Sequence, residues 1–556
     1  MSRRKAASRG APATSQMFDR TGSARWLTFV ALAGTLAAIG LRVLAAVVAG
    51  PLWRDEAGSA STATVSTFAE FWQRQHFDSF PLFWQLLLRF WTTELWNGSD
   101  ASIRTLGLLV SLLLVAALWW TCRCFRVVPL ASLLFAGVAP AFVLWSGIQN
   151  RAYGLGAVLL ALLIGAVWRF VQAPTARRVA LAAVLAVLAV QTTYHIPTML
   201  AALLAAAALI GLRRRSWAVV ISAAGIGIVA AASLLIYVGV LERTRVLAKM
   251  VYAKELPLSS IAAGLHTALA PGGSFVVVAF ALLASAACGW GWVVALRSAA
   301  PRTDSDAGDA VIFAAAAATF AIVGQVIFLL YLRFLVQPWY YVTAILVVAV
   351  AIDVVLQRGI PVARVRDAIA AGIALLLAVS TVYAVGATNR RQSNLDLVAA
   401  YLKDKARPGD LIVVYPWHYG LSFSRYYDGS VPFMTIPAVE GHDYHRFDQL
   451  EQLMRKPELI QPGFRRIYQT LEAGGGVWVV GQPSSEITPQ FPVLPPPRDE
   501  DPSSWRDGFY TAVAGLQLGW VLQQSSPQAQ RVPPLTDARV SDYEDAPITL
   551  YAKQPR

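Results

Sequence analysis

Residues 310–331, AVIFAAAAATFAIVGQVIFLLY, decide the fold, because this run contains no charged side chain. A helix needs about 20 mainly apolar residues to cross the hydrocarbon core of a membrane. Ten further runs of similar character precede or follow this one. The eleven expected spans are 26–49, 102–121, 128–147, 153–170, 179–194, 196–212, 217–240, 272–296, 310–331, 339–356 and 368–387. We therefore expect a polytopic α-helical membrane protein with about 11 transmembrane helices.

The overall composition agrees with this interpretation. Of the 556 residues, 56% are hydrophobic and only 14% are charged, whereas globular proteins contain about 45–50% apolar and about 25% charged residues. An ordinary soluble enzyme is therefore excluded. Three cysteines in a chain of this length also exclude a disulfide framework.

Basic residues predict the orientation in the membrane, because cytoplasmic loops are enriched in Lys and Arg. The formal net charge is +14, and the excess is concentrated in the tail 1–25 and in alternate loops. The basic positions in those loops are Arg123, Arg126, Arg169, Arg177, Arg178, Arg213, Arg214, Arg215, Arg297, Arg302, Arg358, Arg364 and Arg366. We expect a multi-pass protein of the plasma membrane with a cytoplasmic N-terminus. The excess is an orientation signal and does not indicate a nucleic-acid partner.

After residue 388 the chain changes character, with 17 Lys and Arg against 19 Asp and Glu and no run long enough to span. Apolar strands are expected at 411–415, 477–480 and 548–551, with helices at 393–405, 446–456 and 462–473 between them. Strands that alternate with helices favour an α/β arrangement. Because an odd number of spans precedes it, we place this small extracytoplasmic α/β domain, residues 388–556, outside the cell and call it the outer domain.

The first outer loop, residues 50–101, is unusual within the expected membrane module 26–387. Asp55 and Glu56 follow the first span closely, and His76 and Asp78 precede PLFWQLLLRFW. The aromatic stretch 68–96 is typical of a helix that lies in the membrane interface. Taken alone, the carboxylates also fit a solvated turn, and the aromatic stretch also fits a simple interfacial anchor.

The combination of these motifs resembles the polyprenyl-phosphate-dependent glycosyltransferases of the GT-C fold. This superfamily includes protein O-mannosyltransferases, aminoarabinose transferases and the bacterial RgtA/B/C/D-like group. The matching stretches are WRDEA, HFDSFPLFWQLLLRFW, SGIQNRAYGLGAVLLAL and, less specifically, YLRFLVQPWYYVTAILVV. Phe80-Pro81 and Phe83-Trp84 stand where the family usually has a double proline and a Tyr pair. The outer domain, with GDLIVVYPWHYGLSFSRYY, also looks like the tails of many bacterial members.

The resemblance implies an inverting transfer of a sugar from a polyprenyl-phosphate donor to an envelope glycan, glycolipid or protein. Asp55 is the implied general base, and Glu56 belongs to the same catalytic carboxylate pair. Arg151 and Arg333 are the implied ligands of the donor phosphate. The substrate cavity is expected to include His76, Asp78, Tyr153, Tyr194 and His195. The resemblance implies no definite cofactor and leaves open whether the enzyme needs a divalent metal ion. The Ala-, Arg- and Val-rich composition is typical of high-GC bacteria, which favours a mannose or arabinose donor.

Several alternatives stay open. An arginine at the end of a span can reach lipid headgroups instead of a bound phosphate. His442, Asp443 and His445 form a motif that could bind a metal ion but is also typical of a solvated loop. Arg42, inside the first span, is expected to pair with a carboxylate or to extend to the membrane surface, and Asp353 is expected at a cytoplasmic helix end.

A non-enzymatic transporter or lipid flippase with an outer accessory domain is the competing function. Such a protein is expected to show repeated halves or paired charges in the middle of the membrane. The sequence shows neither clearly, and its carboxylates gather in the outer loop instead.

Overall fold

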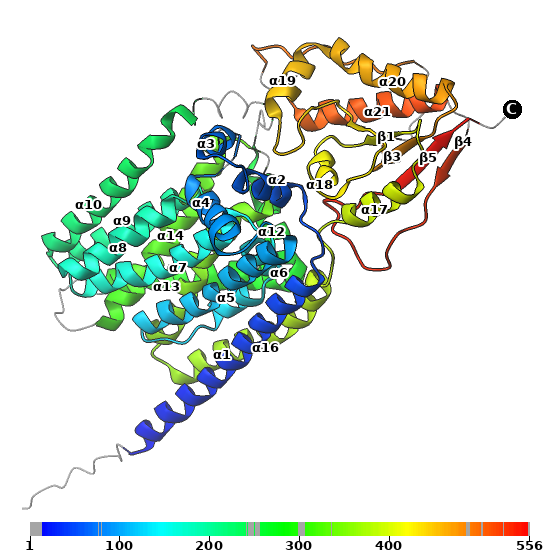
Figure 1. Cartoon of the computed structure of the whole chain (residues 1–556). Coiled ribbons are helices and arrows are strands. Elements are labelled where there is room, and N and C mark those ends of the chain that lie inside the picture. The colour runs from blue at the N-terminus through cyan, green and yellow to red at the C-terminus, as the bar shows by residue number, and fades with distance from the viewer. Residues whose placement is uncertain are drawn as a thin grey trace, which may run out of the picture.

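The apolar runs form long helices that lie side by side in one bundle, and the outer domain sits at one end of it (Figure 1). The computed structural model describes residues 14–75, 77–78, 80–240, 242, 250, 256–297, 306–334, 336–484, 490–501, 504–525 and 528–553. Within these ranges, nine helical segments are long and apolar enough to cross a membrane. They comprise α1 (Thr14–Val48), α5 (Asp100–Cys124), α7 (Ala152–Gln172), α9 (Ile196–Arg213), α10 (Trp217–Ser233) with η4 (Leu235–Tyr237), α13 (Ser274–Arg297), α14 (Asp306–Leu332), α15 (Val342–Val354) with η7 (Pro338–Tyr341) and η8 (Val355–Gly359), and α16 (Ala363–Thr388).

The other two expected spans are helical but shorter or broken. The first consists of η2 (Leu133–Val138), α6 (Pro140–Val143) and η3 (Leu144–Ile148), and Pro140 marks the interruption. The second is α8 (Ala176–Val190), which has 15 residues. At about 1.5 Å per residue, α8 covers only about 22 Å of a hydrocarbon core of about 30 Å.

Contacts at both ends show that α8 nevertheless runs from one face of the bundle to the other. At its start, Arg178 donates to the carbonyl of Arg169 at the end of α7. Beyond its other end, the carbonyl of Gln191 accepts a hydrogen bond of 3.1 Å from the backbone N–H of Phe83 in the first loop. The number of eleven membrane crossings stays a prediction.

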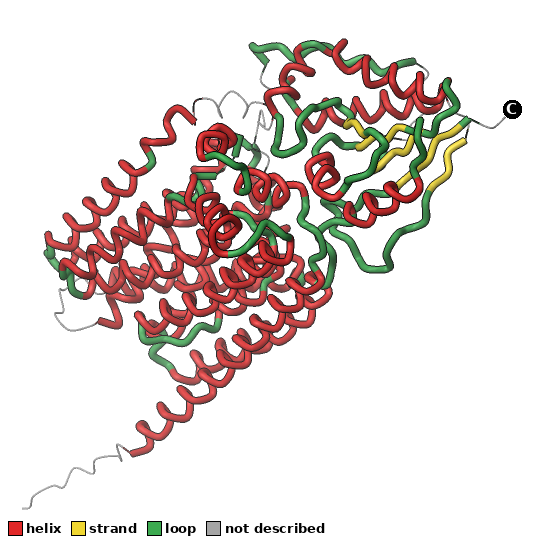
Figure 2. The backbone as a smooth tube through the Cα atoms, viewed as in Figure 1, coloured by secondary structure: helices red, strands yellow, loops and turns green. Residues whose placement is uncertain are grey.

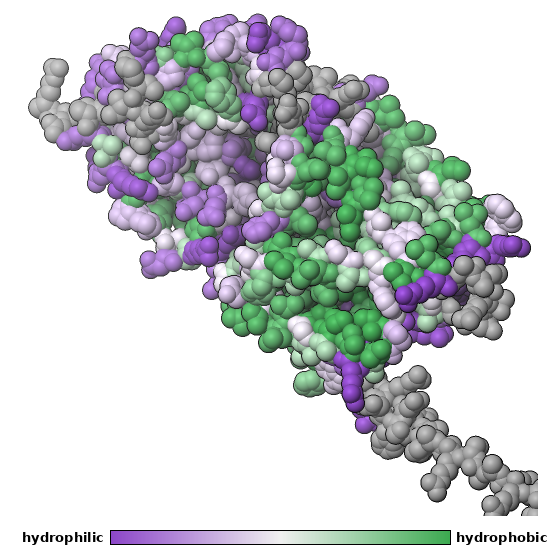
Figure 3. Space-filling view, turned by 180° about the vertical axis from the view of Figure 1, so that it is seen from behind, coloured by the Kyte–Doolittle hydropathy of each residue, from purple (hydrophilic) through white to green (hydrophobic). Residues whose placement is uncertain are grey.

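The surface of the bundle is suited to lipid. Figure 3 shows hydrophobic side chains gathered over the helical bundle and hydrophilic ones over the outer domain. Phe29 and Leu36 of α1, Ile221 of α10, Leu282 of α13 and Val382 of α16 are each more than 60% exposed. Single apolar residues are common on any protein surface, but rows of them along several parallel helices mark a membrane-facing region.

The first loop folds into short helices between the bundle and the outer domain (Figure 1). These are α2 (Arg54–Ala63), α3 (Phe68–Gln75), α4 (Leu82–Phe90) and η1 (Trp91–Leu95). Helix α12 (Leu258–Leu269) and η6 (Ala270–Gly272) precede α13, and Tyr341 donates to the carbonyl of Ile261 in α12. The single interfacial helix expected over 68–96 is therefore two helices, with a break ahead of Pro81.

The outer domain contains a five-stranded sheet, and the strands drawn in yellow in Figure 2 all lie in this domain. The strand order is β2-β1-β3-β5-β4, in which β1 is parallel to β2 and β3, and β5 is antiparallel to β3 and β4. The strands are β1 (Leu411–Val414), β2 (Phe433–Thr435), β3 (Val477–Val480), β4 (Gln528–Arg531) and β5 (Ile548–Ala552). The three expected strands are present, whereas β2 and β4 were not expected, since each is short and lacks a run of apolar residues.

Helices cover both faces of this sheet. Ile412 and Val414 of β1 pack with α17 (Leu395–Lys405) and α18 (Tyr419–Tyr426) on one face. Leu411 and Val413 pack with α20 (Gln461–Glu472) and α21 (Asp507–Ser525) on the other. Helix α19 (Phe447–Arg455) and η9 (Pro457–Ile460) lead into α20. The alternation of side chains along β1 explains why this strand is apolar throughout.

Two charged residues inside the bundle are satisfied by backbone groups. Arg42 is fully buried and donates to the carbonyls of Ala38, Ser111 and Gly137. Both expected alternatives, a carboxylate partner and extension to the membrane surface, are therefore wrong. Asp353 is also buried, and it accepts from the backbone N–H groups of residues 130–132 at 2.8–3.0 Å and from the Ser132 hydroxyl at 2.6 Å. These bonds attach the start of the broken helix 131–148 to α15.

We expect Asp353→Ala to lower the free energy of unfolding by about 3 kcal/mol or more, because it leaves several buried donors without an acceptor. Asp353→Asn keeps one acceptor oxygen and is expected to lose less. Thermal unfolding of the purified full chain in detergent measures both. Unfolding of Asp353→Ala at the wild-type temperature would contradict the anchoring role.

Candidate functional site

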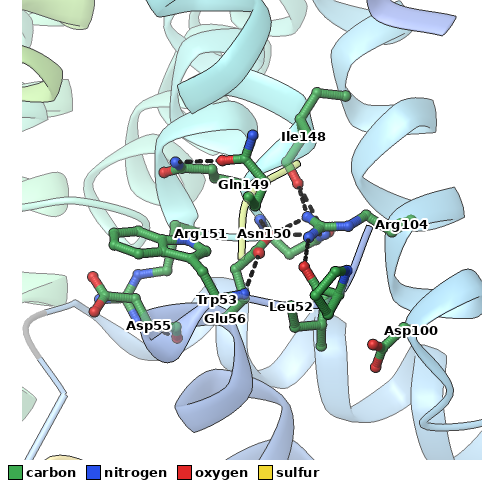
Figure 4. A network of polar contacts seen from close by, with 12 residues as sticks. Leu52, Trp53, Asp55, Glu56, Asp100, Arg104, Ile148, Gln149, Asn150 and Arg151 are labelled. Carbon is green, nitrogen blue, oxygen red and sulfur yellow. Dashed lines mark hydrogen bonds and ion pairs between the residues drawn. The ribbon is translucent and has the colours of Figure 1, made fainter. Parts of the chain in front are cut away.

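The position of the candidate site depends on Glu56, which lies in the first turn of α2 and is 1% exposed. Its carboxylate accepts from Arg104 of α5 at 2.5 Å, from the backbone N–H of Asn150 at 2.7 Å and from the backbone N–H of Trp53 at 3.1 Å. Arg104 also donates to the carbonyls of Pro51 and Ile148. Figure 4 shows this network joining α2, α5 and the segment before α7.

Glu56 is therefore engaged inside this buried network, which does not favour a direct catalytic role, and its expected place in a catalytic pair stays a prediction. Neighbouring positions on a helix point about 100° apart, and in Figure 4 Asp55 points away from Arg104. Burial against Arg104 leaves no part of the Glu56 carboxylate open to a substrate. Its bonds hold the neighbouring residue Asp55 at the end of the bundle that faces the outer domain.

Asp55 lines a cavity between the first loop and the outer domain, with about 390 Å³ of space including its open mouth. The residues around it come from α2, α3, the loop after α3, the start of α7 and the outer domain. They are Asp55, Gly58, Ser59, Thr62, Arg74, Phe77, Asp78, Arg151, Tyr444, His445 and Phe447. Three of the residues expected from the sequence, Asp55, Asp78 and Arg151, therefore meet in one place.

Arg151 stands at the N-terminal end of α7 with its guanidinium in this cavity. One terminal nitrogen donates to the Ser59 hydroxyl at 2.9 Å and to the backbone carbonyl of Asp55 at 3.0 Å. The other lies 3.9 Å from an oxygen of Asp78, and the guanidinium carbon is 4.6 Å from the centre of the Phe80 ring. Burial by itself lowers the pKa of Arg151, but the charges of Asp55 and Asp78 raise it overall. Arg151 is a permanent cation.

The Asp55 carboxylate lies among positive and hydrogen-bonding groups. One oxygen is 3.2 Å from Nε2 of His445 and 3.4 Å from Nε of Arg54. Burial raises the pKa of Asp55, but Arg151, the hydrogen bond from His445 and Arg54 outweigh it, so the pKa lies well below its ordinary value. The surroundings of Asp55 therefore favour its ionised form.

Asp78 is held by a different contact. Its other oxygen accepts a hydrogen bond of 2.5 Å from the Gln85 amide in α4. The neighbouring candidate His76 lies outside the described residues. Of the residues that the structure does describe, no group of three or more His, Cys, Asp or Glu is arranged to hold a metal ion.

Other expected site residues lie beside the cavity or away from it. Tyr153 packs edge-on against Phe80 at 5.1 Å, next to Arg151. His195 packs on Tyr340 at 4.7 Å, and Tyr194 contacts Tyr237. Arg333 is exposed, has a left-handed backbone (φ 52°) and is absent from the cavity lining in the described part of the chain. The structure therefore does not place Arg333 in one cavity with Asp55 and Arg151.

The outer domain completes the site through the segment 441–447, GHDYHRF, which we call the His445 loop. Asp443 forms an ion pair of 3.3 Å with Arg74, and the Tyr444 ring contacts Phe77 at 5.0 Å. His442 packs instead against Phe433 in β2. The His-x-x-His spacing therefore serves two separate contacts and not one metal site. The sequence shows this motif, but no local pattern connects it with Asp55, 390 positions earlier.

A second cluster attaches the outer domain to the first loop. Arg425 forms an ion pair of 2.7 Å with Asp100, and the Tyr426 hydroxyl donates to the same carboxylate at 2.6 Å. Glu544 is fully buried and accepts from the backbone N–H of Arg54 and the hydroxyl of Ser422. Burial raises the pKa of Glu544 to about 8, although hydrogen bonds from Ser393 and Ser422 oppose it. Ser422, Arg425 and Tyr426 lie in the stretch GDLIVVYPWHYGLSFSRYY, but the sequence did not single out any of these residues for a role.

We expect Glu56→Ala to lower the free energy of unfolding by about 3–5 kcal/mol, because it leaves the buried Arg104 guanidinium uncompensated. The double variant Glu56→Gln/Arg104→Met is expected to recover part of the loss, since no buried charge stays unpaired. Thermal unfolding of the three proteins measures this. A double variant less stable than Glu56→Ala would contradict it.

The raised pKa of Glu544 also predicts a pH dependence. Between about pH 4.5, the ordinary value, and about pH 8, the folded protein keeps a proton that the unfolded chain releases. The free energy of unfolding therefore falls as the pH rises through this range. We expect Glu544→Gln to flatten this slope in unfolding temperatures measured across the range, and Glu458→Gln, an exposed carboxylate, to keep it. An unchanged slope in Glu544→Gln would contradict the role.

No protein-family model matches the chain, and no curated protein matches it. Among solved structures, the chain is similar to the archaeal oligosaccharyltransferase AglB from Archaeoglobus fulgidus in complex with an inhibitory peptide and a dolichol-phosphate, with a TM-score of 0.47, 11% identity and coverage of 82% of this chain and 69% of that one. The apo form of the Archaeoglobus fulgidus oligosaccharyltransferase has a TM-score of 0.49 and 13% identity, with coverage of 82% of this chain and 69% of that one. For its complex with Zn and sulfate the TM-score is 0.47 and the identity 13%, with coverage of 81% of this chain and 68% of that one. These three TM-scores are below 0.5, and the similarity does not identify the family or the activity of this chain.

Proposed function

We propose that the protein is an inverting membrane glycosyltransferase that moves a sugar from a polyprenyl-phosphate donor to an envelope glycan, glycolipid or protein. The observation that carries this proposal is the meeting of an ionised carboxylate, Asp55, with a partly buried arginine, Arg151, in one cavity at the end of an apolar bundle. A transfer to a hydroxyl group needs a proton acceptor on one side of the reacting carbon and a stabilised leaving group on the other.

Arg151 suits the leaving phosphate. Its hydrogen bonds to Ser59 and to the Asp55 carbonyl both use one terminal nitrogen. In the described structure, the other terminal nitrogen has only the 3.9 Å contact with Asp78. A guanidinium can bind two phosphate oxygens in a bidentate fork. A phosphate that displaces the weak Asp78 contact gains a permanent cation whose attraction grows as negative charge develops on the leaving oxygen.

The position of the cavity favours a donor carried by a lipid. Arg151 lies directly before α7, whose residues 152–172 are mainly apolar and mostly buried in the bundle. Nucleotide sugars stay in the cytoplasm, so an enzyme with its site on the outer side needs a membrane-borne donor. A polyprenyl chain would lie along the helices with its phosphate at the level of Arg151. Mannose- or arabinose-type sugars are the donors that we propose.

The reaction is a single displacement at the anomeric carbon. The acceptor oxygen attacks from the side opposite the phosphate, and the polyprenyl phosphate leaves, which inverts the configuration. The carboxylate of Asp55 supports removal of the acceptor proton, and Asp78 contacts the acceptor. We assign the phosphate contact to Arg151 and do not include Arg333, which lies outside the cavity.

A transporter is less well supported, because the two charged residues described above inside the bundle already have hydrogen-bond partners in the backbone. Arg42 donates to backbone carbonyls, including that of Gly137 beside the helix break, and Asp353 accepts from backbone N–H groups. Neither residue offers a binding group to a solute that passes through the described part of the bundle.

The proposal predicts that the full chain, reconstituted in liposomes, consumes one or more of a panel of radiolabelled polyprenyl-phosphate sugars when supplied with acceptor glycans. We expect Asp55→Asn to lower kcat by about 100-fold or more. Arg151→Lys keeps the charge but loses the bidentate fork, so kcat is expected to fall by about 10- to 100-fold. Arg407→Gln, at an exposed arginine of the outer domain, serves as the control.

Two results would reject this function. One is no consumption of any donor by the wild type. The other is turnover by Asp55→Asn and Arg151→Lys at the rate of Arg407→Gln. Movement of an intact lipid-linked sugar across the bilayer without release of polyprenyl phosphate would favour the transporter.

A further inference from the structure

The outer domain contains a second cavity, which we call the β5 cavity. It has about 620 Å³ of space including its open mouth. The described residues that line it include Gln482, Gln523, Arg531, Thr549 and Tyr551, and they come from β4, β5, the second half of α21 and the loop 481–484 after β3. None of these residues lines the cavity of the candidate site, so the proposed transfer does not explain this second cavity.

The register of the sheet explains the floor of the β5 cavity. Side chains alternate between the two faces of a strand, so Thr549 and Tyr551 of β5 lie on the same face as Val479 and Val477, their partners in β3. Helices α20 and α21 pack on this face of β1 and β3. Arg531 of β4 is paired with Thr549 and shares its face. The floor is therefore the part of the sheet next to the strands that α21 covers.

The wall of the β5 cavity is built into the fold. Gly519 of α21 lies so close to the loop 481–484 that a Cβ at this position would clash with the carbonyl of Ser484. Gly481 has a left-handed backbone (φ 96°), and its N–H donates to the carbonyl of Pro547 at 2.7 Å. A Cβ at Gly481 would clash with the carbonyl of Tyr415. Because close backbone packing fixes the loop against α21, the cavity is present before any ligand binds.

The side chains around the β5 cavity suit a sugar ring. Gln482 and Gln523 carry amides, which both donate and accept hydrogen bonds, and Thr549 carries a hydroxyl. Arg531 adds a fork of donors. Tyr551 is half-buried and offers an aromatic face together with a hydroxyl. A sugar has hydroxyls that donate and accept around its edge and apolar C–H groups on its faces, and this set of side chains matches both.

Other classes of ligand match this set less well. A purely apolar ligand would take the amides and the guanidinium out of water without giving them partners, which costs free energy. A small anion would use Arg531 but not the ring of Tyr551. Gln482, Gln523 and Arg531 are exposed, so without a ligand they are hydrated and can exchange this water for sugar hydroxyls.

Helix α21 connects the β5 cavity with the candidate site. Asp507 begins this helix, and the positive charges of Arg54 and His445 act on its carboxylate. From Asp507 to Gln523 the helix rises by about 24 Å, at about 1.5 Å per residue. Figure 1 shows α21 lying along the outer domain, with α19 near one end. A single sugar cannot reach from one cavity to the other, whereas a chain of several sugar units can.

We infer that the β5 cavity binds sugar units of the acceptor, away from the hydroxyl that receives the new sugar. This inference rests on the proposed glycosyl transfer. It selects an acceptor with an oligosaccharide chain from the three acceptor classes, which are an envelope glycan, a glycolipid and a protein. The outer domain then holds the acceptor chain while its end lies in the cavity with Asp55.

Binding without any donor tests the β5 cavity directly. The probes are dye-labelled tetrasaccharides of mannose, arabinose, galactose and glucose, and fluorescence polarisation measures their binding to the full chain in detergent. We expect at least one of them to bind. The Kd should rise by about 3- to 10-fold in Gln523→Ala and by about 10-fold or more in Arg531→Ala, because each variant loses hydrogen bonds to the sugar.

Two exposed neighbours provide matched controls. Gln524 follows Gln523 on α21 but points about 100° away from it. Gln530 precedes Arg531 in β4 and pairs with Leu550, whose side chain packs on the other face of the sheet. Gln524→Ala and Gln530→Ala should keep the wild-type Kd, and unfolding temperatures of all variants show whether the fold is intact.

Turnover tests the role of the β5 cavity in acceptor binding. With the donor that the wild type consumes, Gln523→Ala/Arg531→Ala should raise the KM for a tetrasaccharide acceptor by about 10-fold or more. The kcat should not change, because neither residue lines the cavity with Asp55. The KM for a monosaccharide acceptor should also not change, since one sugar does not reach the β5 cavity.

Three results would overturn the inference. They are no binding of any tetrasaccharide to the wild type, equal binding by Gln523→Ala/Arg531→Ala and Gln524→Ala, or an unchanged KM for the long acceptor in the double variant. The glycosyl transfer itself stands in each case. If the wild type consumes no donor, the proposed function and the acceptor role fail together, whereas tetrasaccharide binding that the double variant loses still supports a sugar site in the β5 cavity.

Discussion

The buried ion pair between Glu56 and Arg104 is the constraint on which the rest of the site depends. It lies where α2, α5 and the chain before α7 converge, and the backbone N–H of Asn150 and the carbonyl of Pro51 complete it. A buried pair of charges adds little net stability. Any arrangement that separates the two charges is strongly disfavoured, because a buried charge without its partner costs free energy. Since Asp55 is adjacent to Glu56 and Arg151 is adjacent to Asn150, the same pair brings the carboxylate and the guanidinium of the cavity together.

The cavity is shared between two parts of the chain that are far apart in sequence. The first loop supplies Asp55 and Asp78, the bundle supplies Arg151, and the His445 loop covers the opposite side. Attachment of the outer domain through Arg425 and Asp100, and through Glu544 at the start of α2, fixes that loop over Asp55. The outer domain therefore belongs to the site and is more than an accessory module, which gives a physical reason for a folded domain of this size beside a membrane bundle.

Buried charges serve two different purposes in this chain. Arg42 and Asp353 are consumed by backbone groups at the broken helix 131–148, where interrupted turns leave carbonyls and N–H groups without helical partners. Asp55 and Arg151 face an open cavity instead, and their surroundings keep both of them charged. Residue type and position along the chain do not show which charged residue has a structural role and which one lines the cavity. The groups that each residue contacts do show it.

The sequence by itself determined the membrane class, the nine membrane-length helices of the described residues, the outer-domain helices α17, α19 and α20, and three of the five strands. It also provided the candidates Asp55, Asp78 and Arg151. Apolar length, helix and strand patterning and local motifs are properties of short segments. It could not separate Asp55 from Glu56, which are adjacent and chemically alike, since their roles depend on which one faces Arg104. It could not place Arg333 outside the cavity or His445 inside it. Those assignments belong to the tertiary structure alone, because they depend on contacts between residues as far as 390 positions apart, and no local pattern carries that information.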